Sequence, residues 1–141
     1  MTTPRRASFT LVDSVVKPGT SKQIDIPVAR LPPGDWARMD VVVLHGRTPG
    51  PTIWLSGAIH GDELNGIEIV RRVLTLLDPK KLSGTVIAVP IVNLFGVTSG
   101  SRYLPDRRDL NRSFPGSARG SLAGRLAHLF FDTVVSRCST G

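Results

Sequence analysis

The feature that most constrains the fold is a change of hydrophobic period between residues 52 and 92. Residues 52–59 form a strand-like run, and residues 85–92 are almost continuously apolar, which is typical of a strand buried on both faces. Between them, apolar residues recur at helical spacing over 63–77, and Asp78-Pro79 ends that pattern. The sequence therefore predicts a strand, helix, strand unit.

The flanking segments extend this pattern in both directions. Residues 39–44 are a β-branched run, and the turn residues after them predict a hairpin with 52–59. Ser121 is positioned to cap a last helix over 121–135. We expect an α/β fold with a mixed or mostly parallel sheet, in which residues 1–36 are a β-rich lead-in and residues 37–141 belong to the α/β domain.

Composition limits the class of protein. With 141 residues, 40% of them hydrophobic and 21% charged, the chain is sized for a single folded domain and is unlike a disordered protein. No apolar run is long enough to cross a membrane, and the N-terminus lacks the apolar core of a secretion signal. Cys138 is the only cysteine, so we expect no internal disulfide and a cytoplasmic location. The net charge of +7 favours anionic partners.

The first candidate site is the segment His60-Gly61-Asp62-Glu63, at the junction of the strand and the helix. An imidazole nitrogen and a carboxylate oxygen are standard zinc donors, and ligands collect beyond the carboxyl ends of strands in open α/β sheets. His60 and Glu63 are therefore candidate zinc ligands. The alternative is that Asp62 and Glu63 only cap the helix while His60 is a surface residue.

The second candidate site lies in residues 93–120, where regular periodicity disappears and a functional loop is expected. Asn111 and Arg112 could bind a carboxylate, because a guanidinium forms two parallel hydrogen bonds and an amide adds a directed donor. Arg102 could stabilise negative charge on a carbonyl oxygen. A turn with solvated arginines is the alternative.

Together these motifs resemble the N-terminal part of the succinylglutamate desuccinylase and aspartoacylase family, relatives of zinc carboxypeptidases. The resemblance covers about residues 50–135, with Gly-Ala-Ile-His-Gly-Asp-Glu at 57–63, Gly-Thr-Val-Ile-Ala-Val-Pro at 84–90 with Asn93, and Asp-Leu-Asn-Arg at 109–112. It implies a three-layer α-β-α fold of the zinc-peptidase type. It also implies that His60 and Glu63 bind Zn²⁺, that Asn111 and Arg112 hold the substrate carboxylate, and that Arg102 polarises the scissile carbonyl, a role that Arg107 or Arg108 could take instead.

The resemblance also implies residues that this chain lacks. Family members supply a second histidine ligand in a strand after the last helix, and a catalytic glutamate later still. His45 is a poor substitute, since a hairpin would place it about 23 Å from His60. His128 lies mid-helix, and Glu68 points away from Glu63 on the helix. We therefore expect an inactive N-terminal fragment whose exposed strand edge favours self-association.

The sequence is compatible with three functions. The first is a zinc-dependent amidohydrolase that removes the acyl group from an N-acyl amino acid or a similar small carboxylate. The second is a metallocarboxypeptidase, which uses the same zinc and carboxylate chemistry. The third is a basic nucleic-acid-binding domain, motivated by the net charge of +7, although only Tyr103 and Phe114 are interleaved with the arginines.

Overall fold

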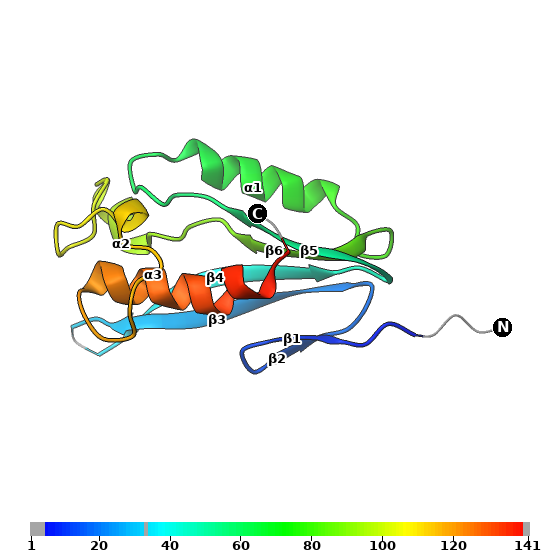
Figure 1. Ribbon diagram of the computed structural model, residues 1–141. Helices are drawn as coiled ribbons and strands as arrows, with labels where there is room; N and C mark the ends of the chain where they lie inside the picture. The colour runs from blue at the N-terminus through cyan, green and yellow to red at the C-terminus, as the bar shows by residue number, and fades with distance from the viewer. Residues whose placement is uncertain (1–4, 33, 140–141) are drawn as a thin grey trace.

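The structure, a computed structural model, describes residues 5–32 and 34–139 (Figure 1). In chain order the elements are β1 (Phe9–Leu11), β2 (Ser14–Val16), β3 (Thr20–Arg30), β4 (Trp36–His45), β5 (Thr48–Ser56), α1 (Asn65–Leu76), β6 (Ser83–Val89), α2 (Leu94–Ser99), η1 (Leu110–Arg112), α3 (Leu122–Thr133) and η2 (Val135–Arg137). The predicted strand, helix, strand unit is confirmed as β5, α1 and β6. No helix of the described residues is long and apolar enough to span a membrane.

Four strands form a mixed sheet in the order β3-β4-β6-β5. β4 is antiparallel to both β3 and β6, whereas β5 and β6 are parallel. The predicted hairpin of 39–44 with 52–59 is wrong, because β6 lies between β4 and β5 and pairs with both. The mixed sheet agrees with the expectation, and the crossover through α1 joins the parallel strands β5 and β6.

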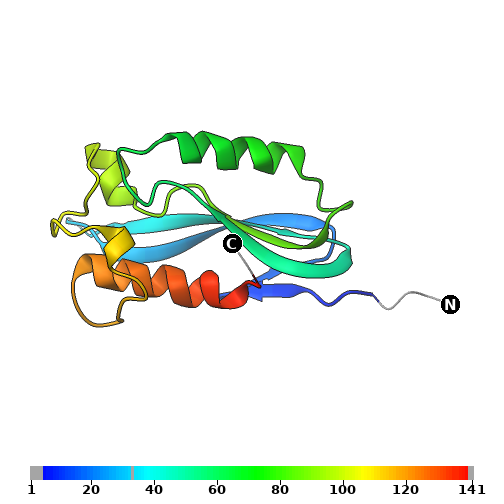
Figure 2. The same ribbon diagram turned by 45° about the horizontal axis from the view of Figure 1, so that its top comes forward.

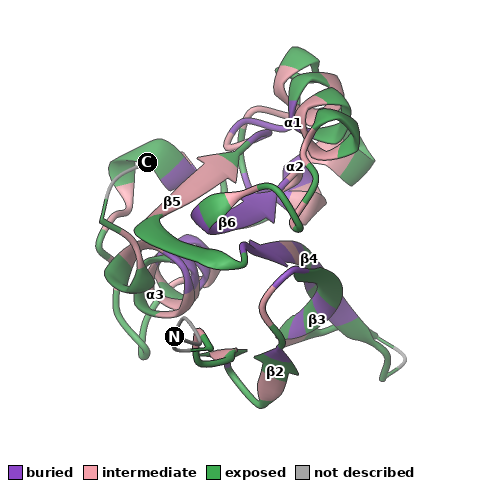
Figure 3. Ribbon diagram, turned by 90° about the vertical axis from the view of Figure 1, so that its right-hand side faces the viewer, coloured by how far each residue is buried: buried purple, intermediate pink, exposed green. Residues whose placement is uncertain are grey.

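The helices lie on both faces of this sheet. Figure 2 shows α1 over one face and α3 beneath the other, with β1 and β2 on the α3 side. Alternate residues of β4 point toward α3, where Met39, Val41 and Val43 pack in one apolar core with Leu126 and Phe130. Figure 3 shows the central strand β6 buried, while β5 at the sheet edge is only half-buried.

The structure bears on two predictions about segments: the lead-in of residues 1–36 and the irregular segment 93–120. β3, which belongs to the predicted lead-in of residues 1–36, pairs with β4 along its length, and the division at residue 36 stays a prediction. Residues 93–120 were expected to be irregular, but the structure contains the short helix α2. Its start is fixed by Asn93, whose Oδ1 accepts a hydrogen bond from the Gly96 N–H at 2.9 Å. A six-residue helix is too short to produce a readable hydrophobic period.

A pair of like charges on the exposed face of β3 and β4 gives the first prediction. Asp25 and Asp40 are directly opposite each other, and the pKa of Asp40 is raised above its usual 3.8 by burial, by its hydrogen bond with Asp25 and by the charge of Asp25. The folded state therefore holds the proton more tightly, and stability is lost as pH rises through the raised pKa. Asp40→Asn should stabilise the chain at pH 7 by about 0.5 kcal/mol in urea denaturation.

Urea denaturation of the wild type and of Asp40→Asn at low pH distinguishes repulsion between Asp25 and Asp40 from a general effect of removing a charge. Below pH 3.8 the advantage of Asp40→Asn should shrink, because the wild-type carboxyl is then protonated in both states. Asp13→Asn removes one carboxylate from the exposed turn between β1 and β2 and should leave the stability nearly unchanged. An equal gain from both variants would contradict the prediction.

Candidate active site

The candidate active site lies just beyond the C-terminal ends of β5 and β6. The chain leaving β5 is tied to the chain leaving β6 by backbone hydrogen bonds: the Val92 N–H donates to the Gly57 oxygen at 3.1 Å, and the Asn93 N–H donates to the Ala58 oxygen at 3.0 Å. Ala58 has a left-handed φ of 50°, which an L-residue adopts only at some cost. The two strand ends therefore hold the segment before His60 in one conformation.

His60 and Glu63 face each other across the turn that follows. The Nδ1 atom of His60 lies 3.3 Å from a carboxylate oxygen of Glu63, and the Glu63 N–H donates to the His60 backbone oxygen. His60 is only 6% exposed, whereas the Glu63 side chain is 65% exposed. The structure thus brings together the two residues that the sequence predicts as zinc ligands.

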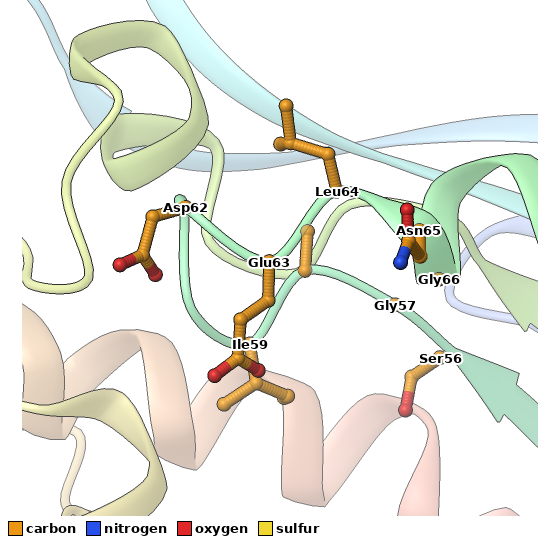
Figure 4. Close-up of a pocket in the computed structure, with 9 residues that line it drawn as sticks. Ser56, Gly57, Ile59, Asp62, Glu63, Leu64, Asn65 and Gly66 are labelled. Carbon is orange, nitrogen blue, oxygen red and sulfur yellow. The ribbon is translucent and has the colours of Figure 1, made fainter.

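The alternative role of Asp62 and Glu63 as helix caps is not supported. α1 begins at Asn65 with Leu64 as its N-cap residue, and no side chain forms a cap hydrogen bond there. Figure 4 shows the carboxylates of Asp62 and Glu63 extending in different directions from the turn. The start of α1 therefore does not account for these two carboxylates.

Two residues from the loop after α2 complete a ring of four side chains with His60 and Glu63. The Nε2 atom of His60 lies 2.9 Å from Oδ1 of Asp109. The guanidinium of Arg102 lies 3.3 Å from Glu63 and 3.4 Å from Asp109. In this ring the imidazole and the guanidinium each lie between the two carboxylates.

Asp109 determines which nitrogen of His60 is open to a ligand. The Asp109 side chain is 16% exposed. Burial alone would raise its pKa, but the hydrogen bonds from His60 and from the Asn111 N–H, with the charges of His60 and Arg102, bring that pKa below its usual value. Asp109 is therefore ionised and accepts a hydrogen bond from the Nε2–H group of His60, so that in the neutral ring the lone pair lies on Nδ1, which faces Glu63.

Asp109 is the functional residue that the sequence analysis did not assign. The signal was present, because Asp109 stands two residues before Asn111 in the Asp-Leu-Asn-Arg run. Metal-binding histidines commonly donate their second N–H to a carboxylate. The sequence therefore offers a carboxylate of the right kind, but a separation of 49 residues from His60 gives no sign that the two side chains are in contact.

Helix α2 supports the turn at Gly61 through close backbone packing. A Cβ atom at Gly61 would lie 1.8 Å from the Gly96 carbonyl carbon and 2.3 Å from the Ser101 oxygen. Gly61 does not have a positive φ, so the position requires space and not conformational freedom. The fully buried Asn93 joins the two segments, since its side chain caps α2 and also donates to the Ile59 oxygen at 3.3 Å.

An open cleft of about 710 Å³ lies beside Glu63 (Figure 4). It is lined by the end of β5, the turn and the first residues of α1: Ser56, Gly57, Ala58, Ile59, Asp62, Glu63, Leu64, Asn65 and Gly66. This space is large enough for a small organic ligand next to Glu63, one of the two candidate metal ligands.

The predicted anion-binding residues are only partly brought to the ring. The Asn111 backbone N–H donates to Asp109 Oδ1 at 2.9 Å, and both Asn111 and Arg112 are exposed on the 3-10 turn η1. Among the described contacts, the Arg112 side chain forms no ion pair. Arg102, and neither Arg107 nor Arg108, is the arginine that contacts Glu63 and Asp109.

The other residues considered for the site lie elsewhere. His45 is buried at the opposite end of the sheet, where its ring bonds Thr85 Oγ1 at 2.8 Å and the Ala7 oxygen at 2.9 Å. His128 is half-buried on α3. Glu68 pairs with Arg71 and Arg72 on the exposed face of α1, and these hydrogen bonds lower its pKa to about 2. The exclusion of His45 is thus correct, although the hairpin used to argue it is wrong.

Within the part of the chain that the structure describes, no three His, Cys, Asp or Glu side chains are grouped to hold a metal ion. Asp109 does not make a third ligand, because it lies on the Nε2 side of His60 while Glu63 lies on the Nδ1 side. The described residues therefore bring together only the two predicted donors, His60 and Glu63.

Comparison with known proteins identifies the family. Residues 49–140 match the succinylglutamate desuccinylase/aspartoacylase catalytic domain, and this match covers more than half of the chain. The chain belongs to the succinylglutamate desuccinylase/aspartoacylase family. Members of this family are deacylases that hydrolyse amide bonds, and the resemblance inferred from the His60 and Asp109 motifs is confirmed.

Individual relatives agree with this assignment. The chain is 39% identical over 100 residues to the N-alpha-acetyl-L-2,4-diaminobutyric acid deacetylase of Halomonas elongata, a match that covers 70% of this chain and 29% of the relative. A succinylglutamate desuccinylase/aspartoacylase structure from Rhodobacter sphaeroides superposes with a TM-score of 0.75 at 31% identity, over 86% of this chain and 38% of that one.

A third relative is the product-bound ectoine utilization protein of Ruegeria pomeroyi, with a TM-score of 0.75 and 26% identity, over 98% of this chain and 42% of that one. The chain therefore spans less than half the length of each of these relatives.

Proposed function

We propose that this chain is part of a zinc-dependent deacylase that hydrolyses the amide of an N-acyl amino acid or a similar small carboxylate. The observation that carries the proposal is the arrangement of His60, whose Nε2 is held by Asp109 while Nδ1 faces the Glu63 carboxylate. The family is metal-dependent, and an imidazole nitrogen beside a carboxylate is a donor set suited to zinc.

His60 and Glu63 would hold the zinc ion. When bound, zinc lowers the pKa of a water molecule and polarises an amide carbonyl. Asp109 orients the His60 ring and fixes its tautomer, so that Nδ1 keeps its lone pair. The cleft beside Glu63 provides room for the substrate at these donors.

The arginines and Asn111 would act on the substrate. Arg102 contacts Glu63 and Asp109, and its positive charge would stabilise the carbonyl oxygen as that atom becomes negative during hydrolysis. Asn111 and Arg112, both exposed on η1, would bind and orient the substrate carboxylate.

The third zinc ligand and the general base are proposed to lie in the further length that the relatives possess. A catalytic zinc normally has three protein ligands and one open position, and the described residues supply two. The position of β5 as the outermost strand of the described sheet supports this proposal, as does an apolar hollow of about 350 Å³ between β5 and α3. Its lining includes Trp54, Phe114 and Phe130, the kind of surface that further polypeptide covers. By itself the chain is expected to be inactive.

The substrate proposal is tested by an assay of N-acetyl amino acids with the full-length protein and zinc. N-acetyl-diaminobutyrate is the first compound to test, because a relative with 39% identity is a deacetylase of that compound. Release of acetate that requires zinc supports the proposal. A folded, zinc-loaded protein that releases no acyl group from any N-acyl amino acid contradicts it.

Asp109→Asn provides a prediction about the orientation of His60. The amide retains the shape of the carboxylate but loses its charge and can present an N–H to the ring. Zinc affinity of the full-length protein, measured by calorimetry, should fall by about 10- to 100-fold.

The matched control for this variant is Asp106→Asn. Asp106 belongs to the same loop, but its carboxylate accepts N–H bonds from Arg108 and Ala123 and does not contact His60. Zinc affinity should be retained in that variant. An equal loss in both variants would show that loop stability, and not the hydrogen bond to Nε2, determines zinc affinity.

A further inference from the structure

A second cleft lies at the opposite end of the sheet from His60. It has a volume of about 570 Å³ and is lined by two segments close to the N-terminus: Arg5, Arg6, Ala7 and Ser8 from one, and Lys17, Pro18 and Thr20 from the other. The Gly19 N–H donates to the His45 backbone oxygen at the end of β4, and His45 is paired with Thr85 near the start of β6. His60 follows the other ends of the strands, so the two clefts are separate.

The charge of this second cleft is uncompensated. Arg5, Arg6 and Lys17 all line it, and its lining contains no carboxylate. Across residues 5–32 and 34–139, no ion pair joins any of these three cations to an acidic side chain, whereas Arg71 and Arg102 each pair with a glutamate. A concave surface with cations alone is a site of positive potential.

Arg6 is held rigidly at the base of this cleft. Its Nη1 atom donates to the backbone oxygens of Gly46, Gly84 and Thr48 at 2.8, 2.9 and 3.1 Å, and Nη2 donates to Thr85 Oγ1 at 3.2 Å. All four acceptors are neutral, so they fix the guanidinium without cancelling its charge. The pKa of the neighbouring His45 is lowered mainly by burial, and the charge of Arg6 lowers it further.

The turn that carries Lys17 is also fixed. Gly19 has a φ of +76°, and the Thr20 hydroxyl and N–H both bond the Lys17 backbone oxygen. A Cβ atom at Gly19 would lie 2.8 Å from the Arg47 side chain, so a fourth cation packs over the turn. The exposed side chains of Arg5 and Lys17 remain able to adjust to a ligand.

We propose that this cleft binds the phosphoryl group of a small molecule. A phosphoryl group carries close to two negative charges at neutral pH, which suits one fixed guanidinium and two mobile cations without a competing carboxylate. The volume exceeds that of phosphate alone, which leaves space for an organic part. This site shares no residue with the proposed zinc site and does not depend on it.

The test is a titration of the ¹⁵N-labelled chain with inorganic phosphate at low ionic strength, followed by amide chemical shifts. Shifts confined to the amides of Ser8, Gly19 and Thr20 are expected. The double variant Arg5→Ala/Lys17→Ala should weaken phosphate binding by about tenfold or more. The double variant Lys80→Ala/Lys81→Ala removes the same charge from the exposed loop after α1 and should change the affinity by less than about twofold. Arg6 is left intact because its hydrogen bonds support the fold.

Two further titrations, with glycerol phosphate and with acetate, test whether the cleft prefers an organic phosphate to free phosphate and a phosphate to a carboxylate. Tighter binding of glycerol phosphate than of inorganic phosphate would show that the cleft also contacts the organic part, whereas equal binding would assign it to free phosphate. Acetate at the same concentration should bind more weakly. Equal shifts with acetate, equal losses in both double variants, or no shifts with any phosphate would each overturn the proposal.

Discussion

Replacing His60 with alanine is expected to lower the zinc affinity of the full-length protein by roughly 10³-fold and to bring amide hydrolysis close to background. The physical reason is the loss of one of the few donors of a catalytic zinc ion. The substitution also leaves the Asp109 carboxylate without the partner that lies 2.9 Å away. Calorimetric titration with zinc and an acyl-release assay would measure the two effects separately.

The control for His60→Ala is Glu68→Ala, which removes a carboxylate from the exposed face of α1. Zinc affinity and hydrolysis should be retained there. Circular dichroism of both variants would show whether the fold persists, because the loss of a buried hydrogen bond can also destabilise the chain. Unchanged zinc affinity in a folded His60→Ala protein would remove this residue from the metal site and with it the proposed zinc chemistry.

Gly61→Ala is expected to produce the largest loss of stability among single methyl additions at this site, about 3 kcal/mol, or to prevent folding. The added Cβ would overlap backbone atoms of Gly96 and Ser101, at 1.8 to 2.3 Å. Backbone atoms cannot rotate away as the end of a side chain can, so either the turn or α2 must move. Thermal and urea denaturation of the chain would measure the loss.

The matched control is Gly100→Ala at the end of α2. No atom lies within 4 Å of a Cβ at Gly100, although its φ of 63° disfavours alanine by about 1 kcal/mol. The difference between the two variants therefore isolates the steric overlap from the general loss of a glycine. Equal destabilisation by both would contradict the packing explanation. If Gly61→Ala still folds, its zinc affinity should also fall in the full-length protein, because the displaced turn carries His60 and Glu63.

Much of the fold could be predicted from local patterns. The helical period of residues 63–77 and the apolar run of 85–92 correspond to α1 and β6, because each pattern reports the burial of its own element. Ser121 caps α3 as expected, with its hydroxyl accepting from the Gly124 N–H. The pairing partner of each strand could not be predicted from such local patterns. β4 and β5 are close in sequence, yet β6 lies between them, since pairing depends on the crossover through α1.

For the candidate site, local patterns in the sequence were enough to propose His60 and Glu63 as partners. A histidine and a glutamate three residues apart, after a strand, form one turn in which both side chains can face the same point. The contact of Asp109 with His60, and that of Arg102 with Glu63, which neither Arg107 nor Arg108 makes, could be found only from the three-dimensional structure. These contacts join residues 39 to 49 positions apart. They exist because β5 and β6 end side by side and α2 directs the following loop back to the turn, and such long-range proximity leaves no periodic signal in the chain.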